Sequence, residues 1–160
     1  MKRLLVLTLS LLLAHEAATA APATATGPAA LALASVVAEH SPLLSGRDRS
    51  VMHRLFDGHL NFSYPNNKKI SVKADAVVCR ISNVDITRRS CDLTFGTHKR
   101  SLTGRRAHEV YATAAEAGIA SEGAAGSIIE SFSNLVCTID PNEIKQSAGG
   151  GADCMFDTGP

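Results

Sequence analysis

Three side chains close together in the sequence have the types needed for acid–base catalysis or metal binding: His53, Asp57 and His59. His53 and Asp57 are four residues apart and share one face if the segment is helical. His59 follows directly after Gly58. An imidazole–carboxylate group of this kind suits general acid–base catalysis or a pH-sensitive site. Because the spacing does not fix the geometry, a capped helix end with polar side chains is the alternative.

Other catalytic motifs are incomplete. His108-Glu109 begins like H-E-x-x-H, but Ala112 occupies the place of the second histidine, so that zinc motif is absent. No serine lies in a G-x-S-x-G motif, and the glycine-rich stretches lack the lysine of a phosphate-binding loop. We therefore predict no cofactor and no metal. A small extracytoplasmic hydrolase that uses His53, Asp57 and His59 is the enzymatic alternative.

The first 20 residues predict a secretory signal peptide. Lys2 and Arg3 precede an apolar stretch over residues 4–14, and Ala18-Thr19-Ala20 provides a cleavage site. We expect cleavage near Ala20-Ala21 and a periplasmic or secreted protein. No apolar run reaches the ~20 residues that a membrane span needs, so no transmembrane segment is expected in the mature chain.

The four cysteines agree with export. An even number of cysteines behind a signal peptide predicts two disulfides, for which three pairings exist. A zinc site is the alternative, but the spacings of 12, 46 and 17 residues lack the close pairs typical of zinc. The four are Cys79, Cys91, Cys137 and Cys154.

Composition favours one packed domain. The chain has 160 residues, of which 45% are hydrophobic, while only 4% are aromatic and Trp is absent. The scarcity of aromatic rings argues against sugar-binding clefts and single-stranded nucleic-acid surfaces. Residues 21–28 are small and Pro-rich and predict a disordered leader, followed by a single domain over residues 29–160.

Charge is distributed unevenly. Residues 47–106 contain 13 basic and 5 acidic side chains, whereas residues 107–160 contain 1 basic and 8 acidic ones. This asymmetry favours recognition of an anionic partner, unless the two parts interleave and their charges cancel. The expected export argues against nucleic acid. The predicted partner contacts are Arg88, Arg89, Lys99, Arg100, Arg105 and Arg106, with the first doublet at one end of a hairpin and the other two at its far end.

Periodicity places the elements. Apolar residues spaced three and four apart predict helices over 29–40, over 51–57 with Ser50 as the cap, and over 102–117. Runs of β-branched and apolar residues predict strands over 70–81, 91–95, 128–139 and 154–156, with a possible strand over 60–64. The connections over 83–88 and 142–153 are expected as loops. No internal repeat is evident along the chain.

One register places each cysteine pair on a buried face. If Cys79 lies opposite Cys91, Val77 lies opposite Leu93, and the apolar residues of both strands share one side. If Cys137 lies opposite Cys154, the pairs are Leu135 with Phe156 and Ile139 with Ala152. We therefore predict the disulfides Cys79–Cys91 and Cys137–Cys154, each closing a short loop.

These elements predict an α+β fold. We expect a small antiparallel sheet of about four to five strands, one main helix packed across it, two short N-terminal helices and two disulfides. The expected function is a small, exported, non-enzymatic binding module that recognises a protein or an anionic envelope component. An inhibitor of a secreted enzyme belongs to this class, because disulfide-held loops lose little entropy on binding. A structural envelope protein is a further alternative.

Overall fold

The computed structural model describes residues 21–82, 84–117, 127–147 and 150–159, and the expected signal peptide lies outside these ranges. Within them the fold is α+β, with a six-stranded antiparallel sheet in the order β1-β6-β5-β2-β3-β4. The strands are β1 (Ala21–Thr26), β2 (Ile70–Ser82), β3 (Ser90–Phe95), β4 (His98–Thr103), β5 (Ser127–Ile139) and β6 (Ala152–Thr158).

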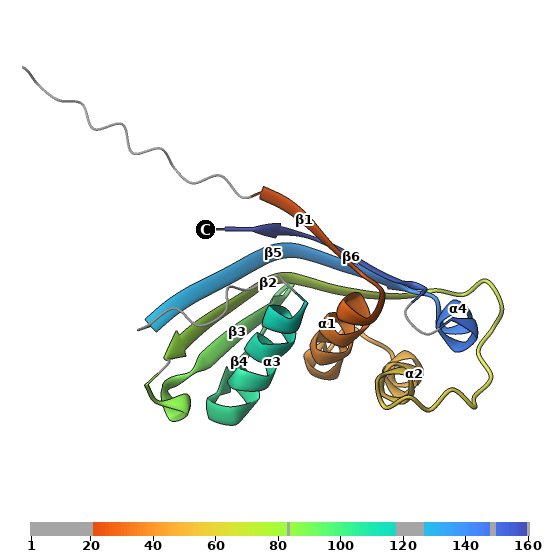
Figure 1. Ribbon diagram of the computed structural model, residues 1–160, viewed down its shortest axis with the longest axis horizontal. Helices are drawn as coiled ribbons and strands as arrows, with labels where there is room; N and C mark the ends of the chain where they lie inside the picture. Colours follow the sequence, from red (N-terminus) through yellow and green to blue (C-terminus); the bar gives the residue numbers. More distant parts are fainter. Residues whose placement is uncertain (1–20, 83, 118–126, 148–149, 160) are drawn as a thin grey trace, which may run out of the picture.

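The helices cover one face of this sheet. Figure 1 shows α1 (Gly27–His40) and α3 (Gly104–Glu116) side by side against it, with α2 (Gly46–Phe56) and the short α4 (Pro141–Gln146) towards one end. A 3-10 turn, η1 (Ile86–Arg88), lies between β2 and β3. The prediction of one main helix across the sheet is wrong, because α1 is also a principal packing element. Its residues Ala30, Leu33, Ala34, Val37 and Ala38 are buried.

Both edge strands differ from expectation. Residues 21–28, expected as a disordered leader, instead contain β1, which pairs with β6 from Ala21 opposite Thr158 to Thr26 opposite Asp153. The sequence of β1 gives no hydrophobic alternation, because its residues are small and Ala25 is the one buried residue among them. β4 was not predicted, since Leu102 is its one buried residue. The sheet therefore has six strands rather than four to five.

Smaller differences concern the segments around α2 and α4. The helix α2 begins earlier than predicted, because Ser45 and not Ser50 caps it, with its Oγ accepting a hydrogen bond from the Asp48 amide. Residues 60–64 are irregular and not a strand. The predicted loop 142–153 instead contains most of α4 and the start of β6. Asp140 caps α4, and its Oδ1 accepts hydrogen bonds from the amides of Asn142 and Glu143.

The predicted registers are confirmed at both disulfides. Cys79 lies opposite Cys91 with Val77 opposite Leu93, and Cys137 lies opposite Cys154 with Ile139 opposite Ala152. The expected pairing of Leu135 with Phe156 fails, because the register of β5 against β6 shifts between Ser133 and Val136. All four cysteines are buried beneath the helices.

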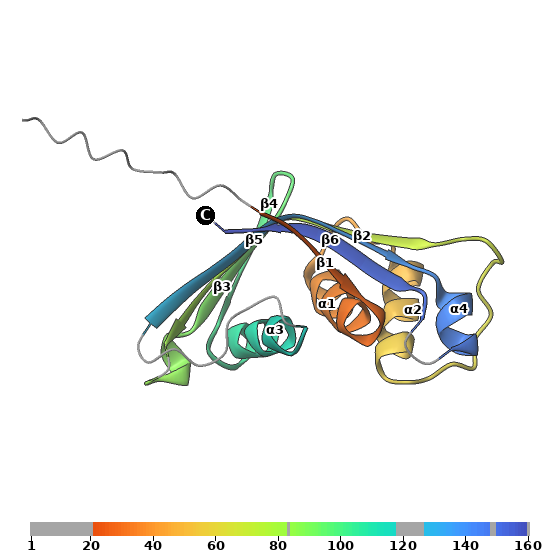
Figure 2. The ribbon, with the colours of Figure 1, turned by 45° about the horizontal axis from the view of Figure 1, so that its top comes forward.

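The sheet consists of two similar halves. Each half has an edge strand, a middle strand and a 13-residue central strand. The edge strand leads into a helix, and a disulfide joins the middle strand to the central strand. The first half is β2-β3-β4-α3, and the second is β5-β6-β1-α1. Every strand runs opposite to its counterpart, which gives an approximate two-fold relation about the central pair β2–β5. Figure 2 shows α1 and α3 together beneath the arch of the sheet.

Local geometry supports this relation. Thr26 and Thr103 occupy the N-cap positions of α1 and α3 with φ of −133° and −134°. The following residues, Gly27 and Gly104, have φ of 61° and 59°. Each helix then places a carbonyl against a disulfide, with Ala30 O 3.4 Å from Cys154 Sγ. The corresponding distance from Ala107 O to Cys91 Sγ is 3.3 Å. The fold therefore contains a repeat whose second copy is circularly permuted, in contrast to the expectation from sequence.

Candidate functional site

The three candidate catalytic residues lie at the end of α2 and are all exposed. Asp57 and His53 are linked through the backbone, where the Asp57 amide donates to the His53 carbonyl as part of the helix end. His59 lines an open surface depression with Arg54 and Asn61. No hydrogen bond between the three side chains occurs in the described part of the chain. Their arrangement matches the capped helix end that the spacing left open.

In the described ranges, no three or more His, Cys, Asp or Glu side chains lie close enough together to hold a metal ion. His40 is the last residue of α1 and belongs to no such group. Burial is the main reason that the pKa of His40 is lowered below 6.5; Glu39 opposes this shift, and the charges of Arg106 and Arg100 add to it. Burial, rather than a neighbouring charge, therefore dominates the shift of the His40 pKa.

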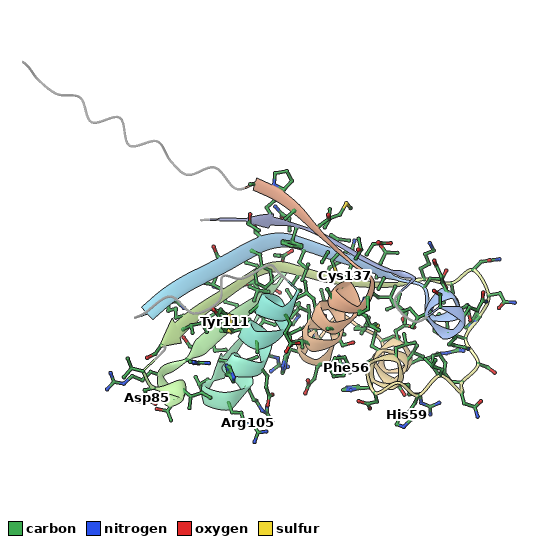
Figure 3. The ribbon with its side chains drawn as sticks, viewed as in Figure 1. Phe56, His59, Asp85, Arg105, Tyr111 and Cys137 are labelled. Carbon is green, nitrogen blue, oxygen red and sulfur yellow. A yellow bond between two sulfur atoms is a disulfide. The ribbon has the colours of Figure 1, made fainter. Side chains whose placement is uncertain are left out.

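Two of the basic doublets lie closer together than expected. Because β4 reverses the chain between β3 and α3, Arg105-Arg106 lies at the same end of the sheet as Arg88-Arg89, and the prediction of opposite ends is wrong. The contact is direct, since the Gly104 amide donates a 2.9 Å hydrogen bond to the Arg89 carbonyl. We call these four arginines the basic end. Figure 3 places Asp85 and Arg105 at this end, far from His59.

Within the basic end, Arg89 is a fixed structural element. Its Nε donates a 3.0 Å hydrogen bond to the Ser82 carbonyl, and its guanidinium also contacts Nδ1 of His108. These bonds join the β2–β3 connection to α3. Arg88 and Arg105 instead form exposed ion pairs with Asp85 and Glu109, at 3.5 and 3.3 Å. Such exposed pairs are weak and leave both arginines available to another anion.

Lys99-Arg100 is separate from the basic end. Lys99 lies opposite Thr94 on the uncovered face of the sheet, whereas Arg100 lies opposite Leu93 on the helical face. The charges of Arg100 and Arg106 both act on His40, the last residue of α1. Among the described residues, no carboxylate forms an ion pair with Arg100 or Arg106.

Two exposed aliphatic side chains next to the basic end were missed by sequence reasoning. Val84 is 91% exposed and Ile86 is 45% exposed. Both belong to the connection over 83–88 that was expected as a plain polar loop. The available signal was a pair of aliphatic residues alternating with Asp85 and Thr87, bounded by Arg88.

The loop 84–88 is held in one conformation by its own hydrogen bonds. Asp85 Oδ1 accepts hydrogen bonds from the amide and the hydroxyl of Thr87, at 2.9 and 2.7 Å, and these bonds lower the pKa of the Asp85 carboxyl. The Ser82 hydroxyl accepts from the Asp85 amide, and the Arg88 amide donates to the Asp85 carbonyl. The Cys79–Cys91 disulfide closes the base of the hairpin. This loop is therefore preorganised, which lowers the entropy cost of binding.

No described helix combines the length and the apolar character needed to cross a membrane. The chain matches no protein-family model, and comparison with curated proteins and with solved structures likewise gives no match.

Proposed function

We propose that this protein is an exported, non-enzymatic binding module that recognises an anionic partner through its basic end. The support comes from comparing the two halves of the fold. Residues 70–116 carry eight Lys and Arg against five Asp and Glu, whereas residues 21–40 and 127–158 together carry one Lys against six acidic residues. The two halves share one backbone plan but have opposite net charge.

The counterpart positions explain why this difference matters. At the same distances from the junction glycine, Arg105-Arg106 corresponds to Pro28-Ala29, and Lys99-Arg100 corresponds to Pro22-Ala23. Arg88-Arg89 precedes Cys91 by the same number of residues as Gly151-Ala152 precedes Cys154, so these two pairs correspond. One half forms this backbone with small or proline residues at all six places, so the shared backbone plan does not require the charges; Arg89 is the exception in its own half, because its hydrogen bonds join the β2–β3 connection to α3. The presence of the other charges in this half is then best accounted for by a partner.

The evidence that the fold does not require these arginines is strongest at the start of α3. Arg105 and Arg106 lie in the first turn, where the helix dipole disfavours cations, and Thr103 makes no side-chain capping bond there. The costs are local and small. An anionic partner would reverse them, because its charge is attracted both to the arginines and to the helix start.

The test is affinity capture with immobilised, oxidised protein comprising residues 21–160. Exported extract from the producing cells is passed over it at low and at high salt, and one partner should be retained only at low salt. The variant Arg105→Pro/Arg106→Ala carries the residues of the other half and should retain it at least tenfold less. Lys69→Ala, which removes a charge at the other end of β2, is the control. Unchanged retention by the double variant would refute the proposal.

Export is tested separately. N-terminal sequencing of the protein recovered from the periplasm or the medium should begin at Ala21. Recovery of the chain only in the cytoplasm, with Met1 intact, would contradict this part of the proposal.

A further inference from the structure

We infer that the loop 84–88 is the anchor of a protein-binding surface, and that its partner presents an apolar segment flanked by carboxylates. This inference rests on the proposed function and narrows it from an anionic partner to a protein. The evidence is a difference between the two halves at one pair of corresponding residues, Ile86 and Ile144.

Ile86 and Ile144 follow the long strands of their halves at the same spacing from the strand cysteine. Ser82 and Asp140 each cap the turn after the strand, accepting a 3.2 Å hydrogen bond from the amide three residues later. The isoleucine is the next residue in both cases. The two connections thus share one hydrogen bond and place an isoleucine at the same distance from the capping residue, although Ile86 begins the 3-10 turn η1 while Ile144 lies within the helix α4.

The two isoleucines differ in what covers them. Ile144 is 6% exposed and belongs to the hydrophobic core, because α2 packs against α4. Ile86 is 45% exposed, and the described part of the first half contains no counterpart of α2. The second half thus shows what this position accepts when it is covered: an apolar helix face, with Leu55 of α2 buried in the same core.

The surroundings of Ile86 specify the charge of the partner. Val84 is 91% exposed, Arg88 ends the loop and Arg89 follows it. Arg105 is next to Gly104, whose amide donates a hydrogen bond to the Arg89 carbonyl. The loop therefore combines exposed apolar area with neighbouring arginines, and arginine is one of the residue types enriched in interface hot spots. Apolar contact would bury Val84 and Ile86, while carboxylates would replace Asp85 and Glu109 as partners of Arg88 and Arg105.

A protein fits these observations better than a lipid surface or a uniform polyanion. The arginines here alternate with Asp85 and Glu109, so the surface offers separate positions for individual carboxylates rather than a uniform positive field. A flat anionic surface would meet those acidic side chains as well. A folded or helical partner can place apolar and acidic side chains at separate points.

The test is photocrosslinking from position 84. Val84 is replaced by benzoylphenylalanine, which keeps the position apolar, and the protein is irradiated in exported extract. Met155, which is 63% exposed on the uncovered face of the sheet, is replaced in the same way as the matched control. We expect one protein to be linked from position 84 and at least tenfold less from position 155. The linked segment should contain apolar residues next to Asp or Glu.

Second substitutions in the position-84 protein define the contact. Ile86→Ser and Arg88→Glu should each lower crosslinking at least tenfold, and Ile86→Leu should preserve it. Disulfide mapping checks that the variants fold. Equal crosslinking from both positions, or a link from position 84 to this chain itself, would overturn the inference.

A vesicle assay distinguishes a protein partner from a lipid membrane. Sedimentation with phosphatidylglycerol vesicles should show no binding that depends on Val84 and Ile86, and such binding would overturn the assignment to a protein. A captured partner that links from position 155 but not 84 would overturn this inference while leaving the proposed function intact. Failure to capture any partner would overturn both.

Discussion

The phenol of Tyr64 donates a 2.9 Å hydrogen bond to Oδ1 of Asp48, which joins the irregular segment before β2 to the first turn of α2. Lys68 adds an ion pair to the same oxygen at 3.3 Å. Burial, followed by the hydrogen bond and the charge of Asp48, raises the pKa of Tyr64 to about 12 from its ordinary 10.0. This contact fixes the segment that replaces the predicted strand over 60–64.

The raised pKa of Tyr64 predicts a loss of stability in alkali. Above pH 10 the unfolded chain releases the phenol proton while the folded chain keeps it, so the free energy of unfolding falls as the pH rises from 10 to 12. Tyr64→Phe should remove this decline and cost about 1–2 kcal/mol at neutral pH. Urea unfolding between pH 7 and 11 measures both effects. An identical alkaline decline in the variant would contradict the assignment.

The same contact predicts an acid-side effect of opposite sign. Burial alone would raise the pKa of Asp48, but hydrogen bonds from Tyr64, Ser45 and Lys68 and the charge of Lys68 lower it below 3.8. The ionised carboxyl therefore stabilises the fold above the ordinary Asp pKa, and this contribution is lost as the pH falls through the lowered value. In Asp48→Asn the decline of stability below pH 4 should be shallower. Urea midpoints between pH 2 and 5 should show this, and parallel curves would argue against it.

Truncation of the two corresponding isoleucines should have unequal effects. Ile144→Ala should lower the free energy of unfolding by about 2–4 kcal/mol, because a buried side chain is removed from the core under α2. Ile86→Ala should change it by less than about 0.5 kcal/mol, since that side chain faces solvent. Denaturant unfolding of the isolated variants gives both values. Similar costs at the two positions would mean that Ile86 is covered within the chain itself.

The sequence predicts best those parts of the fold whose residues carry two signals at once. In β2, β3, β5 and β6, apolar alternation and cysteine positions agree, so strand register and disulfide pairing follow together. The edge strands β1 and β4 carry neither signal. An edge strand has one neighbour, and Ala25 and Leu102 are the one buried residue of β1 and of β4, respectively. Hydrophobic alternation is too weak to reveal such strands.

The candidate site was less predictable for the same reason. Because the prediction lacked β4, it placed Arg88-Arg89 and Arg105-Arg106 at opposite ends of the sheet instead of at the same end. The exposure of Ile86 depends on which element covers it, which no local pattern encodes. The repeat also escaped detection, because α1 and β1 come first in the chain but complete a half built by β5 and β6.

Gly104 should tolerate alanine poorly because of its backbone conformation. Its φ of 59° is in the left-handed region, while a Cβ there would meet nothing within 4 Å, so the expected cost of about 1–2 kcal/mol comes from the backbone alone. Gly46→Ala is the matched control. It begins α2 in equally open space without a positive φ, and alanine there should stabilise by about 0.4–1 kcal/mol. Thermal unfolding compares the two, and a neutral Gly104→Ala would argue against the shared Thr-Gly junction.

The permuted repeat predicts that the chain can be reconnected. Ala21 and Thr158 are paired at the sheet edge, where the Thr158 hydroxyl donates a 3.2 Å hydrogen bond to the Ala21 carbonyl. In the first half, the corresponding ends Phe95 and His98 are joined by Gly96-Thr97. Joining Gly159 to Ala21 through one added threonine reproduces this connection, because Gly96 and Gly159 both have positive φ.

This joined chain should fold when it is opened between Asn66 and Asn67, an exposed turn before β2. It should also fold when opened between Gly96 and Thr97, which makes the first half the split one. Both proteins should form Cys79–Cys91 and Cys137–Cys154 by peptide mapping and unfold cooperatively in urea. Opening between Val77 and Val78, inside the central strand, is the negative control and should abolish folding. If the Gly96–Thr97 opening failed as completely as that control, the two halves would not be equivalent folding units.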